Sequence, residues 1–473
     1  MWDEEFEVVI IGSGFAGLAA AIEARKYCDK VVVFEKMPVP GGNSSICGGI
    51  FSAAGTPLQA ENGIEDSPAL MLADMLASGQ RFNYPELARM VAERSTETLL
   101  WTIEELDVKY QPSLSWVGGH SVPRSYNTWN ASGSGIVKPM LAKCRELNIP
   151  VRLKSCLANF VDDGNNAIEG VEIREEYIFP KSESGTPKRI RATRAVVLAS
   201  GGFSQDKEFR AIQNPRLTED IESTNHQGAT AESLISAIRA GATPVQLSNI
   251  QLGPWASRDE EGFGVGSLFS MLAGFPYGII IDVSTGNRFV NEQSDRKLLV
   301  DSMLNLGTES IAIVDQKGVA YATTLDQCLK RGVVRKFDSI EELAASNHVP
   351  LMPLVNTIKS YNSSIEKGED RFGKWIHKGL EPIQYPPYYS IRLLPKIHHC
   401  MGGIRINTLA QVIGIDTRRP IGRFYAAGEI TGGIHGASRL GGNAVPECIL
   451  FGRIAGANAA REPLRSGHPL SQE

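Results

Sequence analysis

Residues 7–17 read EVVIIGSGFAG, a β-branched run that passes directly into three spaced glycines. The run predicts a short buried strand, and the Ala-rich residues that follow predict a helix. Glycines spaced G-x-G-x-x-G between a strand and a helix bind the pyrophosphate of a dinucleotide. Gly12 permits the tight turn, Gly14 leaves room for the phosphates, and Gly17 lets helix and strand pack closely. The stretch therefore predicts an α/β fold with a Rossmann-type dinucleotide-binding domain.

The residues after this helix extend the same prediction. Residues 31–34 (VVVF) predict a second buried strand, and Glu35 follows it eighteen residues after Gly17, where an acid receives ribose hydroxyls. Two Gly-Gly pairs come next, Gly41-Gly42 and Gly48-Gly49, with Asn43 and Ser44 between them. Paired glycines let backbone run beside a large planar ligand.

Composition narrows the class of protein. A chain of 473 residues exceeds the ~250 to 300 residues at which single cores stop growing, so two domains are expected. The net charge of -5 gives no support to nucleic-acid binding. The seven cysteines contain no C-x-x-C pair, which indicates reduced thiols in the cytoplasm and no metal site. No signal peptide and no apolar run of about 18 residues is visible, so we expect neither secretion nor a membrane span.

The loop of residues 41–50 resembles the flavin loop of the fumarate reductase and succinate dehydrogenase flavoprotein superfamily, which binds FAD. Some members attach FAD through a histidine in this loop. This loop contains none, so the resemblance implies noncovalent FAD. It also implies an FAD-binding domain formed by residues 1–247 and 400–473, with an α+β capping domain, residues 248–399, inserted into it.

Two segments near the C-terminal end resemble the substrate motifs of the same superfamily. Residues 396–403 read KIHHCMGG and residues 435–442 read HGASRLGG. In fumarate reductases the histidine and the arginine of these motifs grip one end of the substrate, and the matching residues here are His398 and Arg439. Arginine offers a planar fork of donors, and histidine adds a donor whose charge adjusts near neutral pH.

The fingerprint and the resemblance together predict a set of cofactor-binding residues. They are Gly12, Ser13, Gly14, Phe15, Ala16, Gly17, Glu35, Lys36, Gly41, Gly42, Asn43, Ser44, Gly48, Gly49, Leu157, Ser200, Gly201, Gly202, Thr224, Asn225, Gly428, Glu429, Arg439, Asn443, Ala444 and Val445.

Two further segments carry charged residues with a possible role near the flavin. Arg288-Phe-Val-Asn-Glu292, with Arg296 four residues later, resembles a segment whose acid and arginine relay protons, and helical i, i+4 spacing predicts that Glu292 and Arg296 lie together. A plain helical salt bridge is the alternative. His120 and Arg124, in a loop that resembles one running near the flavin, are equally compatible with a supporting or surface role.

The chain departs from the fumarate reductase pattern at two places. Where those enzymes have Q-x-H-P, with a histidine for the second carboxylate, residues 251–255 read QLGPW. Gly253 and Trp255 are expected to open space and add an aromatic wall. The resemblance also places a proton-donating arginine at Val319, with Lys317, Tyr321 or Tyr126 as replacements.

These observations predict an FAD-dependent oxidoreductase acting on a carbon-carbon bond next to a carbonyl or carboxylate. We expect an ene-type reductase of a bulky or aromatic acceptor, such as an aryl acrylate, a flavonoid or a steroid-like enone. The alternatives are a ring-ketone dehydrogenase, a true fumarate reductase, or a flavin-binding electron-transfer subunit. Because no second glycine fingerprint exists, the electron donor is expected to be separate: NAD(P)H, reduced flavin or a reductase.

Overall fold

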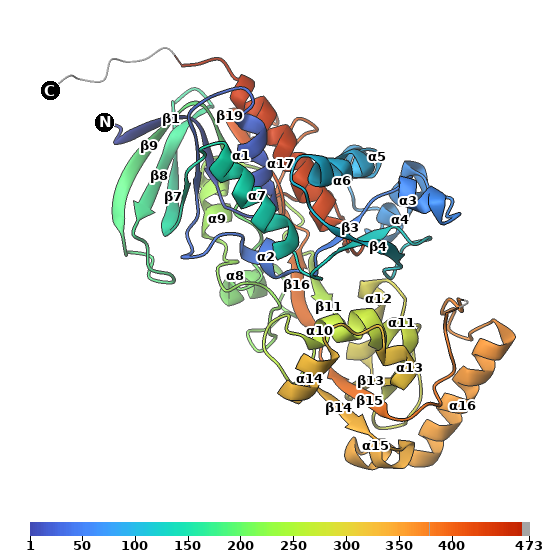
Figure 1. Ribbon diagram of the computed structural model, residues 1–473. Coiled ribbons are helices and arrows are strands. Elements are labelled where there is room, and N and C mark those ends of the chain that lie inside the picture. Colours follow the sequence, from blue (N-terminus) through green and yellow to red (C-terminus); the bar gives the residue numbers. More distant parts are fainter. Residues whose placement is uncertain (378, 466–473) are drawn as a thin grey trace.

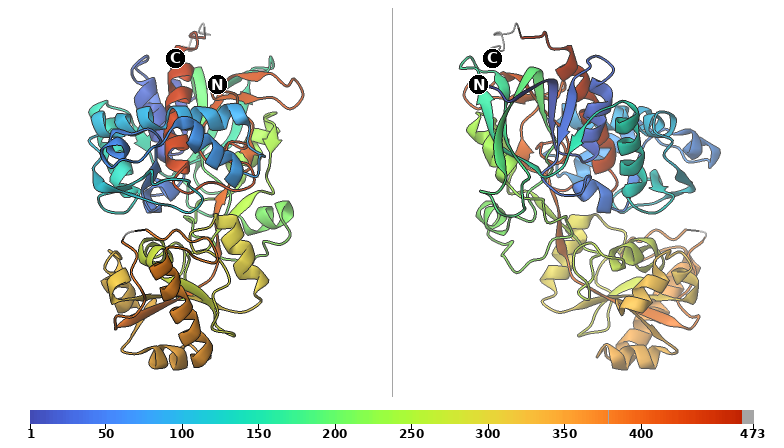
Figure 2. Two further views of the ribbon diagram at one scale, coloured as in Figure 1. Left: turned by 90° about the vertical axis from the view of Figure 1, so that its right-hand side faces the viewer. Right: turned by 60° about the vertical axis from the view of Figure 1, so that its left-hand side comes forward.

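The computed structural model describes residues 1–377 and 379–465, which form two lobes (Figure 1). The first lobe is built from the N-terminal residues and from the C-terminal part of the described chain, and it lies above the second lobe in each view (Figure 2). The second lobe is formed by the middle of the chain. In the described residues, no helix has the length and apolar character needed to cross a membrane.

A parallel sheet forms the centre of the first lobe, in the order β19-β9-β1-β2-β6. β2 and the carboxyl-terminal halves of β1 and β9 are almost continuously buried, as expected of parallel strands covered on both faces. β18 pairs antiparallel with β19, and β7 and β8 extend the sheet from β9. The strands are β1 (Glu4–Ile11), β2 (Val31–Phe34), β6 (Val151–Arg152), β7 (Ser155–Asp162), β8 (Ile168–Glu175), β9 (Thr186–Leu198), β18 (Gln411–Ile413) and β19 (Pro420–Ala426).

Three helices cover this sheet: α1 (Phe15–Ala24), α7 (Ser134–Glu146) and α17 (Ala444–Arg461). Glycines in α17 allow α1 to pack unusually close. A Cβ on Gly452 would lie 2.4 Å from the Ala16 carbonyl oxygen, and one on Gly456 would lie 2.1 Å from that of Ala20. The last helix of the chain is therefore fixed against the glycine fingerprint at its start.

The rest of the first lobe surrounds this core. A three-stranded antiparallel sheet, β3-β5-β4, lies on the side that faces the second lobe. The elements are α2 (Gly42–Ile46), β3 (Ile50–Ser52), α3 (Pro57–Glu61), α4 (Pro68–Ser78), α5 (Pro85–Glu93), α6 (Ser95–Glu104), β4 (Tyr110–Ser115), β5 (Ser125–Thr128), α8 (Lys207–Gln213), α9 (Glu232–Arg239), β10 (Pro244–Val245) and β17 (Gly403–Ile404).

The second lobe contains a four-stranded antiparallel sheet, in the order β12-β13-β15-β14, with an apolar cluster on each face. Its elements are α10 (Gly266–Phe269), a π-helix (Ser270–Gly274), α11 (Phe275–Tyr277), β12 (Ile279–Asp282), α12 (Arg296–Asn305), β13 (Ser310–Asp315), α13 (Gln316–Val319), α14 (Leu325–Arg331), β14 (Val334–Phe337), α15 (Ile340–Ser346), α16 (Leu351–Lys367) and β15 (Tyr388–Leu393).

The chain enters the second lobe through β11 (Ile250–Gly253) and leaves it through β16 (Lys396–Cys400). These two strands pair with each other in antiparallel register. His398 lies on β16, so it stands where the two lobes meet. The molecule thus has the mixed α/β fold with a parallel sheet that the sequence predicts.

Candidate functional site

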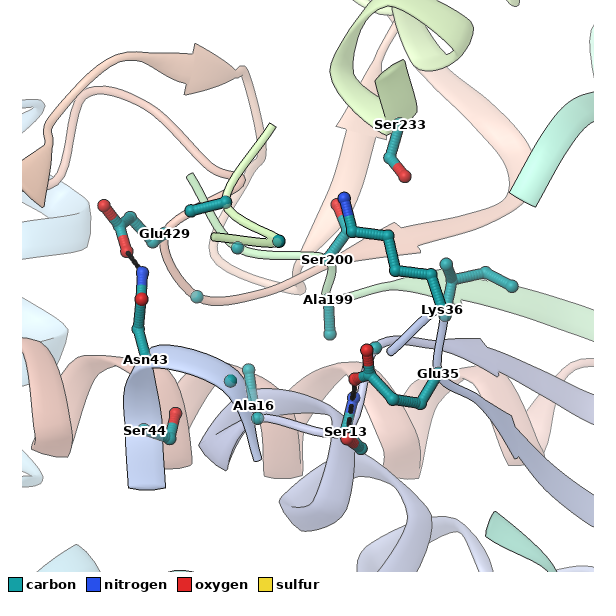
Figure 3. Close-up of a pocket in the computed structure, with 18 of the residues that line it drawn as sticks. Ser13, Ala16, Glu35, Lys36, Asn43, Ser44, Ala199, Ser200, Ser233 and Glu429 are labelled. Carbon is teal, nitrogen blue, oxygen red and sulfur yellow. Dashed lines mark hydrogen bonds between the residues drawn. The ribbon is translucent and has the colours of Figure 1, made fainter. Parts of the chain in front are cut away.

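A long cavity follows the carboxyl ends of the parallel strands. We call its first part the dinucleotide cavity (Figure 3). It is lined by the fingerprint turn, by the 41–44 turn, by the glycine turn 200–202 after β9, and by residues 427–429 after β19. The carboxyl ends of parallel strands are where such folds bind nucleotides.

Glu35 lies at one end of the dinucleotide cavity, where hydrogen bonds from Ser13 and Met37 hold its carboxylate. The Ser13 hydroxyl and backbone N–H donate to Glu35 Oε2 at 2.6 and 3.1 Å, and the Met37 N–H donates to Oε1 at 2.9 Å (Figure 3). The carboxylate lines the cavity in a fixed orientation. It is therefore ready to accept from ribose hydroxyls.

Lys36 and Leu157 line the same end of this cavity. Lys36 Nζ donates to the Thr230 hydroxyl at 2.6 Å and pairs with Glu232. Glu232 therefore balances the charge of Lys36.

The second part, which we call the reaction cavity, continues from the first. Phe15, Asn43, Ser44, Glu429 and Cys448 line both parts. Apart from Gly17 and Asn443, every predicted cofactor residue lines one part or the other. Gly17 instead packs against the Gly12 carbonyl, where a Cβ would lie 1.9 Å from the oxygen.

Features of the chain itself fit FAD in this long cavity. A Cβ on Gly42 or Gly201 would meet no atom within 4 Å, so both turns present bare backbone to open space. Asn443 is fully buried, yet neither atom of its amide has a hydrogen-bond partner in the described residues. Asn443 lines neither part of the cavity, however, so the fit of FAD rests on the bare backbone at Gly42 and Gly201.

His398 is fixed by a hydrogen bond at the base of the reaction cavity. Its Nδ1 lies 2.7 Å from the hydroxyl of Thr224, which also lies 3.3 Å from the Ile397 carbonyl. When the hydroxyl donates to Nδ1, Nε2 carries the proton and is the donor left for a ligand. Burial, together with the charges of Arg296 and Arg439, holds the pKa of His398 well below its usual range. The ring is therefore a neutral donor in the free protein.

Arg439 and Arg296 enter the same cavity from two lobes. They are 4% and 7% exposed, and neither forms an ion pair with a carboxylate among the residues that the structure describes. Arg296 has Gln251 Oε1 at 3.4 Å and lies over the Trp255 ring, 4.4 Å from its centroid. Arg439 donates to the Leu440 carbonyl at 3.4 Å, and its Nε has no partner.

Burial disfavours the charge of both arginines, and the charge of Arg439 also disfavours that of Arg296. Burial lowers the pKa of Arg296 well below its usual value, and the charge of Arg439 lowers it further. Burial also lowers the pKa of Arg439. The charge of Glu429, which lines the same cavity, acts in the opposite direction on Arg439. Two buried guanidinium groups that form no direct ion pair among the described residues favour the binding of an anion between them.

The predicted helical pairing of Glu292 with Arg296 is wrong. Helix α12 begins at Arg296, so Glu292 lies in the turn before it and helical spacing does not apply. Glu292 Oε2 instead pairs with Arg288 at 2.7 Å, and Oε1 accepts from the Ile280 N–H at 3.0 Å. Lys374 and Asp370 complete this buried charge cluster. Arg296 reaches the reaction cavity without Glu292.

The position expected to hold a proton-donating arginine is also not in the cavity. Val319 is 4% exposed and packs in an apolar cluster of the second lobe. Lys317 is paired with Glu381, and Tyr126 packs against Tyr110 in the first lobe. Arg296 is the cation of the second lobe that lines the reaction cavity among the described residues.

Gly253 does not leave the space that the sequence predicts. The indole of Trp255 lies against it, and a Cβ on Gly253 would stand 3.0 Å from a ring carbon. The same indole meets the His398 ring edge-on, with centroids 5.0 Å apart. Trp255 therefore forms the predicted aromatic wall by filling the space itself.

His120 and Arg124 line neither part of the cavity. Arg124 is fully buried and pairs with Asp66 and Asp74 at 2.9 and 2.8 Å. Burial and the Arg124 charge lower the pKa of His120 to about 3, and its Nε2 lies 2.7 Å from the Gly441 carbonyl oxygen. His120 thus supports the glycine turn behind the cavity, and Arg124 lies next to His120, with its Nη1 3.4 Å from His120 Nδ1.

Eight residues that line the reaction cavity were not among the predicted site residues: Ile46, Cys47, Ile50, Phe263, Met271, His399, Gly442 and Cys448. Met271 lies in the π-helix, and no sequence pattern marks such a helix. His399 follows His398 on β16, and its Nδ1 lies 3.6 Å from Glu429 Oε1. The doubled histidine was visible in the motif, and the neighbouring acid could have been found only from the fold.

Comparison with known proteins gives consistent results. A protein family described as "FAD binding domain" matches residues 7–445. The acrylate reductase flavoprotein subunit of Shewanella woodyi is 44% identical over 462 residues, covering 96% of this chain and 91% of that protein. A urocanate reductase of Eggerthella lenta is 31% identical over 466 residues, covering 96% and 75%.

Among solved structures, the open conformation of a flavocytochrome c3 fumarate reductase matches with a TM-score of 0.76 at 30% identity. The match covers 97% of this chain and 79% of that one.

Proposed function

The chain belongs to the FAD-binding flavoprotein superfamily that includes fumarate and urocanate reductases, and on that premise we propose that it reduces a 2-enoate carrying a single carboxylate. It is an FAD-dependent oxidoreductase of the ene-reductase type. The finer proposal rests on one observation: Arg439, Arg296 and the neutral donor His398 line one cavity, and no other arginine or lysine of the described residues lines it.

The chain's own residues account for binding and orientation. Arg439 and His398 hold the carboxylate, whose charge offsets the two buried guanidinium groups. The carboxylate also polarises the adjoining double bond in one direction, because the electron pair shifts toward the carbon that bears it. When bound, reduced FAD supplies a hydride to the far carbon of the double bond.

Arg296 is the group we propose to supply the proton. It reaches the cavity from the second lobe, and its lowered pKa reduces the cost of giving up the proton. The proton adds to the carbon next to the carboxylate, so the double bond gains one hydride and one proton. Trp255, Phe263 and Met271 line the same cavity and exclude water from it.

A single carboxylate fits better than two. Where a dicarboxylate would need its second partner, Gly253 and the Trp255 indole offer no cation. A buried carboxylate without a charged partner loses about 1.5 to 3 kcal/mol for each missing charge-assisted hydrogen bond. The name of the Shewanella relative, acrylate reductase, favours the same class of acceptor.

Reoxidation of the photoreduced holoenzyme tests this proposal under anaerobic conditions. We expect acrylate to reoxidise the flavin at least about tenfold faster than fumarate at equal concentration, because only one carboxylate has a partner. Rapid reoxidation by fumarate alone would contradict the proposal. A ring-ketone dehydrogenase would behave differently, since a saturated ring ketone would then reduce the oxidised enzyme.

We propose that the FAD is noncovalent, that the second lobe caps the reaction cavity, and that electrons come from a separate donor. No histidine occurs in residues 41–50, and Arg296 and Trp255 come from the second lobe. The Shewanella relative is named a flavoprotein subunit, which favours a partner protein as donor. Acid precipitation should release the flavin into the supernatant, and NADH alone should leave the flavin absorbance unchanged.

A further inference from the structure

A third cavity, which we call the side cavity, adjoins the reaction cavity. It has a volume of about 480 Å³, within the range of small-molecule sites. Ile50, Trp255, Met271 and Arg296 line both cavities. A molecule held beside Arg296 can therefore extend from one cavity into the other.

Aromatic rings from both lobes form the wall of the side cavity. Trp116 follows β4 in the first lobe, and Trp375 follows α16 in the second lobe. Their ring centroids lie 4.0 Å apart. Tyr277 and Tyr321 stack at 3.9 Å with their planes 6° apart. Faces and edges of aromatic side chains are the surfaces that bind planar rings.

Polar side chains interrupt this wall without adding a second charged grip. Gln111, Asn127 and Gln293 line the cavity and offer amide donors and acceptors. Glu292 also lines it, but Arg288 neutralises this carboxylate. Among the described lining residues, Arg296 is the one arginine or lysine. The cavity is therefore suited to a neutral ring with a polar substituent.

A π-helix, residues 270–274, positions the boundary between the two cavities. It places Met271 on both and Leu272 on the side cavity alone. Single-turn π-helices occur frequently at functional sites. The indole of Trp255 lies at the same boundary, and its Nε1 is buried without a partner in the described part of the chain.

We propose that the side cavity binds the aromatic ring of an arylacrylate, a 2-enoate with a planar ring on the carbon far from the carboxylate. This inference rests on the proposed function and names the class of its acceptor. The carboxylate stays with Arg439 and His398, and the ring passes Trp255 and Met271 into the side cavity. The double bond gains a hydride and a proton as before, and the ring is unchanged.

The arrangement also explains why Gly253 leaves no room beside the carboxylate site. The indole of Trp255 closes that direction. The larger space lies beyond the indole, on the side of Tyr277 and Trp375. A bulky acceptor thus extends past Trp255 instead of replacing it.

Reoxidation kinetics of the reduced holoenzyme with 4-hydroxycinnamate and acrylate test the assignment. In the wild type we expect the larger acceptor to have the higher kcat/KM. Leu272→Trp fills the side cavity and should lower the ratio of the two values, 4-hydroxycinnamate over acrylate, by about tenfold or more. Leu304→Trp is the matched control, because Leu304 is 57% exposed on α12 and lines no cavity described above.

Binding of the saturated product analogue 3-(4-hydroxyphenyl)propanoate gives a second readout. It should quench tryptophan fluorescence in the wild type, and this quenching should fall in a Trp375→Phe variant. An unchanged ratio in Leu272→Trp, with no quenching in the wild type, would overturn the side-cavity assignment while acrylate turnover kept the proposed function. If no enoate reoxidised the enzyme, both proposals would fail.

Discussion

Four of the six buried arginines in the described residues form two contrasting pairs. Arg124 and Arg288, 0% and 5% exposed, are each held by two carboxylates. Arg296 and Arg439, 7% and 4% exposed, have no carboxylate partner among the described residues. Burial is the same in both pairs, so only the partners differ.

The presence or absence of a carboxylate partner distinguishes arginines that stabilise the fold from those proposed to bind the acceptor. Arg288 pairs with Glu292 at 2.7 Å and Asp370 at 2.6 Å, and this cluster ties the turn before α12 to the loop after α16. A buried charge without a partner costs several kcal/mol, and a fold tolerates that cost where a ligand later supplies the counter-charge. We therefore propose that Arg296 and Arg439, which line the reaction cavity, mark the acceptor site, whereas Arg124 stabilises the interior of the first lobe and Arg288 that of the second.

The largest expected effect is a loss of stability when Arg288, an arginine with two carboxylate partners, is replaced. Arg288→Gln should lower the free energy of unfolding by about 3 to 5 kcal/mol, because it leaves the buried Asp370 without its cation and Glu292 with only Lys374, 3.5 Å away. Urea unfolding of the holoenzyme measures this. Lys297→Gln is the control, since its pair with Asp301 is exposed and should be worth no more than about 1 kcal/mol. Equal effects of the two variants would show that the buried cluster adds nothing to stability.

Arg439→Gln should act on turnover instead. We expect kcat/KM for the acceptor to fall about 10³-fold, the loss typical of a preorganised donor at a developing charge. The FAD content, read from absorbance, should stay near that of the wild type. Arg439→Lys keeps the charge without the planar fork, so its kcat/KM should lie between those of the wild type and Arg439→Gln. A kcat/KM of Arg439→Gln within threefold of the wild type, a difference of about 0.7 kcal/mol, would show that Arg439 does not hold the acceptor.

Arg296→Gln should change turnover and stability in opposite senses. The chemical step should slow by about 10²-fold, because the proton donor is lost. The free energy of unfolding should stay the same or rise, because a buried charge without a counter-ion is removed. Single-turnover reoxidation and urea unfolding give the two numbers. A destabilisation as large as that of Arg288→Gln would erase the distinction between the pairs.

The smallest effect concerns Glu429, the carboxylate whose charge acts on Arg439. Burial raises the pKa of Glu429 from 4.5 to about 7. Between these values the folded state binds more protons at this group than the unfolded state does. The unfolding free energy of the FAD-free protein should therefore fall as pH rises from 4.5 to 7, by at most about 1.4 kcal/mol per pH unit.

A Glu429→Gln variant isolates this contribution. The amide does not titrate, so the decline between pH 4.5 and 7 should become shallower. Urea unfolding at pH 5, 6 and 7 measures the slope in both proteins, and parallel curves would show that Glu429 ionises normally. The outcome decides whether Arg439 has a charged neighbour at neutral pH.

The cofactor half of the site was predictable because its rules are local. A tight turn at Gly12, open backbone at Gly42 and an acid after β2 each depend on a few neighbouring residues and on bare backbone. These residues line one cavity, as the spacing predicts. Gly17 and Asn443 were predicted to bind the cofactor but do not line the cavity. Gly17 packs against the Gly12 carbonyl, and Asn443 is fully buried.

The acceptor half was less predictable because spacing along the chain misled the prediction twice. Glu292 and Arg296 have helical spacing, but the helix begins only at Arg296. Gly253 suggests free space, but the Trp255 ring folds back over it. Both errors come from side-chain directions that local sequence does not set.

By itself, the sequence predicted the α/β fold, the FAD-binding family and two residues, His398 and Arg439, that line the same cavity in the structure. The reason is that backbone conformation and short-range spacing fix those features. The tertiary structure alone decided which buried arginine has a carboxylate partner, where Trp255 lies and where a cavity remains. Those outcomes depend on packing between segments far apart in the chain, where burial and the nearest counter-charge set the energy of each group.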